Sequence, residues 1–140
     1  MIDLCFILLG IAALVSFRPA AWVFVGITLL HDMLYGGSTG IVYFLTAGMS
    51  DLMIIMLIYY LPSPVTQKLM NISLISIVLN LYGWTMYESG QEPIIYSSAF
   101  IALYIYAIYV ITGGRHAGFN PVRDWFGGLR RHSVESGRNH

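Results

Sequence analysis

Three ionisable side chains of this 140-residue chain lie inside long apolar stretches, where a charged group is costly: His31, Asp32 and Asp51. If these stretches are helices with a rise of about 1.5 Å per residue, Asp51 lies about 15 Å from either end of its segment. His31 and Asp32 lie only about 6 and 4.5 Å from the end of theirs, near Tyr35. We therefore expect Asp51 at the centre of a helical bundle and His31 and Asp32 at its rim.

Two uncharged polar residues lie at depths where they can meet Asp51. Asn80 lies about 10 Å from the end of its apolar segment, on a helix face that also carries Ser73 and Ser76. Tyr104 lies about 15 Å from the end of the last apolar segment. We expect Asp51, Asn80 and Tyr104 to meet in the interior of one bundle.

Two interpretations of this cluster remain open. In the first, a protonated Asp51 donates one hydrogen bond to Asn80, to Tyr104 or to a backbone carbonyl, and so holds helices together. In the second, Asp51 takes up and releases a proton, or coordinates an ion, at the centre of a conducting path. His31 and Asp32 are then either the place where protons enter or an ion pair at the surface.

Other chemistry lacks its partners in this sequence. Haem held by two histidines needs a second intramembrane histidine, but the other three lie in the polar C-terminal region: His116, His132 and His140. The single Cys5 provides neither a disulfide nor a metal-binding spacing. No nucleotide-binding loop, nucleophile elbow or zinc-binding HExxH motif occurs. We therefore expect no cofactor, no metal and no enzymatic activity.

The composition indicates what kind of protein holds these residues. Hydrophobic residues make up 57% of the chain and charged residues only 10%, against about 45–50% and about 25% in soluble domains. So few polar side chains cannot cover a globule, and the chain is far too hydrophobic to be disordered. The sequence predicts an all-α integral membrane protein.

Five apolar segments predict a transmembrane helical bundle over residues 1–112: 2–17, 20–35, 41–61, 69–87 and 94–112. As helices, the last three are about 28–32 Å long and match the hydrocarbon core of a bilayer. The first two are about 24 Å long, which is short for a span. The alternative is therefore four full spans plus a hairpin that does not cross completely.

The positions of the charged residues favour five spans. In that arrangement Arg18, Lys68 and the basic C-terminal tail all fall on one face of the membrane, as the positive-inside rule requires. The opposite face receives Asp3, Glu88 and Glu92. A hairpin would instead bring Arg18 toward the bilayer centre, at a cost of at least about 2.5 kcal/mol. We expect a multi-pass protein of a bacterial or viral-host inner membrane, with its C-terminus in the cytoplasm.

Residues 113–140 form a basic polar tail with a short amphipathic interfacial helix expected near 121–131. The apolar stripe of this helix has i, i+3, i+4, i+7 spacing: Val122, Trp125, Phe126 and Leu129. Its arginines lie off the stripe: Arg123, Arg130 and Arg131. These residues are expected either to bind the membrane surface or to dock a cytoplasmic partner. Because lipid explains arginines beside a bilayer, we expect no nucleic-acid partner.

The loops between the five segments are too short to fold into domains outside the membrane. The expected partners are the lipid bilayer and other transmembrane helices, in a hetero-complex or a homo-oligomer. Small residues at Gly10, Gly26 and Ala47–Gly48 would let such helices approach closely. The expected function is a non-catalytic structural, anchoring or assembly subunit of a larger membrane complex. The alternative is a homo-oligomeric pore or a proton- or ion-conducting protein centred on Asp51, channel-like or similar to phage lysis proteins.

Overall fold

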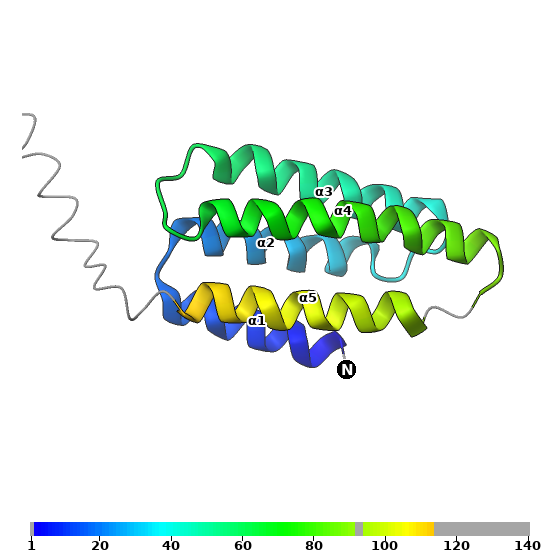
Figure 1. The fold of residues 1–140 in the computed structure, drawn as a ribbon, viewed down its shortest axis with the longest axis horizontal. Helices are drawn as coiled ribbons and strands as arrows, with labels where there is room; N and C mark the ends of the chain where they lie inside the picture. Colours follow the sequence, from blue (N-terminus) through cyan, green and yellow to red (C-terminus); the bar gives the residue numbers. More distant parts are fainter. Residues whose placement is uncertain (1, 92–93, 114–140) are drawn as a thin grey trace, which may run out of the picture.

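The computed structural model of the protein describes residues 2–91 and 94–113. This part of the chain forms five helices (Figure 1): α1 (Ile2–Ser16), α2 (Pro19–Tyr35), α3 (Ile41–Tyr59), α4 (Thr66–Glu88) and α5 (Ile94–Gly113). Each begins and ends within three residues of a predicted apolar segment, so the all-helical prediction with five helices is confirmed. The amphipathic helix expected near 121–131 lies outside the described residues.

Residues with restricted or unusual backbone conformations separate the helices. Pro19 is the first residue of α2, where its missing N–H has no carbonyl to bind. Phe17, between α1 and α2, has a positive φ of 53°, which turns the chain sharply at a residue that is not glycine. Gly40 precedes α3 with a φ of 61°, and Pro62 and Pro64 lie between α3 and α4. These positions make the short turns that fold consecutive helices back on each other.

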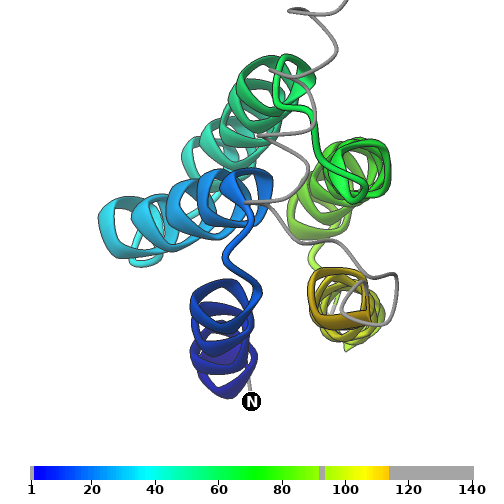
Figure 2. The same cartoon turned by 90° about the vertical axis from the view of Figure 1, so that its left-hand side faces the viewer.

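The five helices close a ring. Each helix packs against the next in the chain, and α5 packs back against α1, while α2 also touches α4 across the ring. Figure 2 shows this arrangement along the long axis of the bundle. The most extensive pair is α3 with α4. Because the connections are short, helices that are consecutive in the chain run antiparallel, and the two ends of the bundle collect alternate loops.

Three of the helices are long and apolar enough to cross a membrane: α3, α4 and α5, with 19, 23 and 20 residues. The other two are apolar but shorter, with 15 residues in α1 and 17 in α2. At about 1.5 Å per residue, α1 and α2 are roughly 22 and 26 Å long, somewhat less than a hydrocarbon core of about 30 Å.

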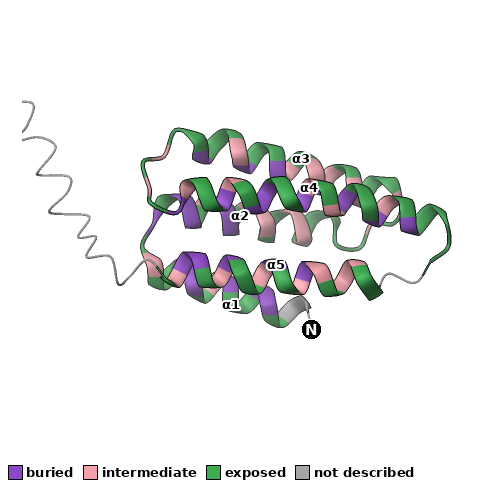
Figure 3. Ribbon diagram, in the orientation of Figure 1, coloured by how far each residue is buried: buried purple, intermediate pink, exposed green. Residues whose placement is uncertain are grey.

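The outward faces of all five helices are exposed (Figure 3), and they carry many large apolar side chains. Every helix contributes at least one large exposed side chain to this surface; examples from α1 to α5 are Leu8, Leu30, Met56, Leu81 and Tyr109. Soluble monomers rarely expose a contiguous apolar patch larger than a few hundred Å². Helices that are hydrophobic all round are typical of proteins surrounded by lipid or by other apolar helices.

The interior of the ring is apolar at one end and polar toward the other. Toward the end where Arg18 lies, the side chains that are almost completely buried are mostly aliphatic, with Ser73 as a polar exception: Ile54, Ile58, Leu69, Ile72 and Ile111. The small residues Ala20 and Ala21 let α2 pack closely against this aliphatic half. Toward the loop between α2 and α3, hydrogen-bonding side chains replace the aliphatic ones.

Gly83 allows α4 to pack closely against α3 and α5. A Cβ atom at this position would overlap the rings of Phe44 on α3 and Tyr96 on α5. These two rings meet edge to face, with centroids 5.6 Å apart. Any larger residue at position 83 would push Tyr96 outward, so this glycine determines where the Tyr96 hydroxyl lies in the bundle.

Candidate functional site

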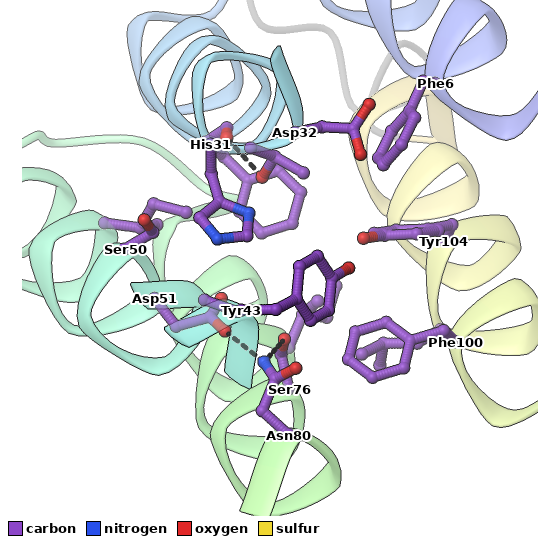
Figure 4. A pocket seen from close by; sticks show the side chains of 16 residues that line it. Phe6, His31, Asp32, Tyr43, Ser50, Asp51, Ser76, Asn80, Phe100 and Tyr104 are labelled. Carbon is purple, nitrogen blue, oxygen red and sulfur yellow. Dashed lines mark hydrogen bonds between the residues drawn. The ribbon is translucent and has the colours of Figure 1, made fainter. Parts of the chain in front are cut away.

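A polar cavity of about 40 Å³ lies inside the bundle, and all five helices line it. Figure 4 shows the polar side chains that converge on it. They come from α2, α3, α4 and α5, and α1 contributes the ring of Phe6. The polar lining consists of Thr28, His31, Asp32, Tyr43, Ser50, Asp51, Ser76, Asn80 and Tyr104.

All five polar residues that the sequence singles out inside the apolar segments line this one cavity: His31, Asp32, Asp51, Asn80 and Tyr104. Asp51 and Asn80 are in direct contact. Tyr104 lines the same space, with its ring between those of Phe6 and Phe100 at centroid distances of 5.3 and 5.8 Å. The residues therefore come together as the segment depths predict, whereas their roles stay predictions.

The Asp51 carboxyl group is part of a hydrogen-bond chain that links three helices. Asn80 Nδ2 donates to Asp51 Oδ2 at 3.4 Å and to Ser76 Oγ, also at 3.4 Å. Tyr96 Oη donates to Asn80 Oδ1 at 3.0 Å. Asp51 is 8% exposed and Asn80 3%, so both groups depend on partners within the protein or in the cavity. Bonds of 3.4 Å are long, which leaves acceptor capacity on the carboxyl group.

The cavity is large enough and polar enough to hold water. One water molecule needs about 10–15 Å³ of such space and two to four polar partners, so this cavity has room for about three. Ser50, Tyr43 and the carboxyl groups of Asp51 and Asp32 all line it. Water at this place would complete the hydrogen bonding of Asp51 and connect it to the rim.

His31 and Asp32 lie at the rim and face different neighbours. His31 Nε2 is 3.1 Å from Thr46 Oγ1, and the Thr46 hydroxyl donates to the Val42 carbonyl at 2.7 Å. Because that hydroxyl has only one hydrogen, we assign the proton of this contact to Nε2 of His31. Asp32 instead points toward Phe6 and Tyr104 (Figure 4). Both side chains are partly exposed.

Two aromatic residues belong to the site although the sequence does not single them out. Tyr96 supplies a hydroxyl to Asn80, and Tyr43 lines the cavity with its own hydroxyl within reach of Tyr96. The signal for Tyr96 is its spacing, because it precedes Tyr104 by eight residues and so shares a helix face with it. Tyr43 likewise precedes Asp51 by eight residues on α3.

No group of three or more metal-binding side chains occurs within residues 2–91 and 94–113. The residues predicted to bind the membrane surface or a partner all lie outside these ranges: Arg123, Trp125, Phe126, Leu129, Arg130 and Arg131.

No family model, curated protein or solved structure matches the chain. The cavity and the surface of the bundle are therefore the features that bear on function.

The hydrogen-bond chain through Asn80 should contribute to stability. Replacing Asn80 by Leu removes both links and leaves Asp51 without its amide partner, so we expect the free energy of unfolding to fall by about 1–2 kcal/mol. Unfolding of the purified protein in mild detergent measures this change. The matched control is Asn71→Leu, because Asn71 is an exposed asparagine on the same helix. Equal losses in the two variants would contradict a special role for Asn80.

Proposed function

We propose that the chain is an integral membrane protein whose five helices all cross the bilayer. The apolar outward faces of every helix support this proposal, because they have no other suitable environment. The ring also supports it, since α1 and α2 pack beside the three helices that are long enough to span. The shortness of α1 and α2 requires only local thinning of the bilayer, which costs a fraction of a kcal/mol per Å.

The charged residues at the two ends of the bundle predict which end faces the cytoplasm. Arg18 and Lys68 lie at one end of the bundle, at the α1–α2 and α3–α4 connections. Asp32 lies near the other end, and Glu88 lies at the α4 terminus there. With basic residues on the cytoplasmic side, the N-terminus would be outside and the C-terminal tail in the cytoplasm.

Within the membrane, we propose that the protein is a non-catalytic subunit that helps to assemble or anchor a larger complex. The observation that carries this proposal is a groove of about 310 Å³ on the outer surface between α3 and α4. Its walls are almost entirely apolar, with Leu45, Met49 and Leu52 on α3 and Leu81 and Trp84 on α4. We propose that this groove holds an apolar transmembrane helix of another chain.

Some small residues of the helices are buried in the packing of the bundle, whereas others face open space. One of the latter lies in this groove. Ala12, Ala13 and Ala47 are buried within the bundle, so they serve its own packing. A Cβ atom built at Gly10, Gly26 or Gly48 meets nothing within 4 Å. Of these three glycines, Gly48 lines the groove. Transmembrane helices associate where small residues let their backbones approach, because lipid tails offer no competing hydrophobic gain.

Filling the groove should disrupt assembly without disturbing the fold. We expect Gly48→Leu to remove partner subunits from the complex extracted in mild detergent, as measured by native mass spectrometry. The matched control is Gly26→Leu, which adds the same side chain at an open position on α2 outside the groove. A Gly48→Leu protein that still extracts with its full set of partners would show that the groove holds lipid.

A second candidate function is proton transfer, and the polar cavity is the observation that favours it. One continuous space joins His31 and Asp32 at the rim to Asp51 in the middle of α3. Beyond Asp51, Ile54 and Ile58 belong to the aliphatic half of the interior. A proton that reaches Asp51 from the rim would therefore need a rearrangement of this half to continue across the membrane.

The two candidates respond differently to Asp51→Asn. The amide can still hydrogen-bond, so a subunit would assemble almost unchanged. A proton path would lose the one carboxyl group that the described helices hold at mid-depth, so proton flux into liposomes should fall to background in a pH-sensitive dye assay. The control is Asp124→Asn, which removes the same charge from the tail. If Asp51→Asn conducts like the unmodified protein, or if neither conducts, proton transfer is excluded.

A further inference from the structure

A second cavity, of about 250 Å³, lies at the opposite end of the bundle from the loop between α2 and α3. It is formed where α2 begins, α4 begins and α5 ends, and its lining includes Arg18, Val65, Lys68, Tyr109 and Gly113. None of these residues lines the polar cavity around Asp51. The aliphatic half of the interior lies between the two cavities.

Arg18 lines this second cavity, and one nitrogen of its buried guanidinium group has no acceptor. Its side chain is only 5% exposed, and Nη1 makes no hydrogen bond within the described part of the chain. Burial lowers the pKa of Arg18, but a guanidinium group stays charged at neutral pH. A buried and unpaired cation is costly, and an anion in the cavity would remove that cost.

One further cation faces the same space. Lys68 is an exposed side chain in the first turn of α4. The positive end of the α4 dipole and the negative end of the α5 dipole both lie at the cavity, so the helix ends offset each other and the positive charge comes from Arg18 and Lys68. Among the described residues, no carboxyl group lines it. Tyr109 and Val110 provide an apolar wall beside the two cations.

We propose that this cavity binds a phosphate group, with Arg18 and Lys68 as its ligands. Arginine pairs with phosphate oxygens through two N–H donors, and lysine adds a point charge. The phosphate can belong to the headgroup of an anionic phospholipid or to a free anion. The apolar wall of α5 fits the acyl chains of a lipid, and this source rests on the proposed membrane location. The phosphate chemistry itself does not depend on that location or on the assembly groove.

The test uses the full chain in dodecyl maltoside micelles, titrated with phosphatidylglycerol or with a diacylglycerol of the same acyl chains, which lacks the phosphate group, and followed by native mass spectrometry. We expect the protein to retain phosphatidylglycerol in preference to the diacylglycerol. Arg18→Gln should reduce this retention about tenfold and Lys68→Gln about threefold, because each removes a charge-assisted contact. The control is Arg138→Gln, which removes the same charge far along the tail and should leave retention unchanged.

A second measurement separates the two sources of phosphate. If inorganic phosphate raises the Tm of the protein in dodecyl maltoside more than chloride does, and Lys68→Gln abolishes the effect, the free anion is the ligand. Lys68→Gln decides the question even if Arg18→Gln does not fold, because Lys68 is exposed. Equal retention of the two lipids with no effect of phosphate would overturn the proposal. So would equal losses in Lys68→Gln and Arg138→Gln, or phosphatidylglycerol retention that is lost when residues 120–140 are removed.

Discussion

A carboxyl group near the middle of α3 constrains how the surrounding helices pack. Asp51 is almost buried among apolar helices, where a polar group without a hydrogen-bond partner is strongly destabilising. Asn80 on α4 supplies the partner, and Tyr96 on α5 holds the amide of Asn80 in place. Gly83, one turn further along α4, leaves room for the ring of Tyr96. The three helices that are long enough to span a membrane are thus joined by one chain of hydrogen bonds.

The interior therefore has two ends with different chemistry. Around Asp51 and toward His31 the space is polar and can hold water, whereas beyond Ile54 it is filled with aliphatic side chains. A permanently open pore through one chain does not fit this arrangement, because the aliphatic half interrupts the polar path. The arrangement does fit a subunit in which the polar cluster holds the helices together. A proton-transfer protein fits it only if the aliphatic half opens during its cycle.

The sequence was sufficient to predict the five helices, because hydrophobicity and the prolines between segments determine where helices can lie in an apolar chain. Helix depth alone was also sufficient to bring Asp51, Asn80 and Tyr104 into one cavity. The direction of each side chain around its helix was harder to predict, because helices that are apolar on every side have no polar stripe. For this reason Tyr96 had no signal beyond its spacing from Tyr104, and Gly83 had none. The burial of Arg18, expected at the membrane surface, depends on how α2, α4 and α5 meet.

The central claim is that all five helices cross the membrane around the polar cluster, and cysteine labelling from the two sides of a sealed membrane tests it most directly. Single cysteines replace Phe17, Ser38, Ser63 and Gln91 in a Cys5→Ser protein, one in each connection between helices. We expect an impermeant thiol reagent to label positions 38 and 91 from one side only, and positions 17 and 63 from the other only. Labelling of positions 17 and 38 from the same side would show that α2 does not cross, and would contradict the five-span account.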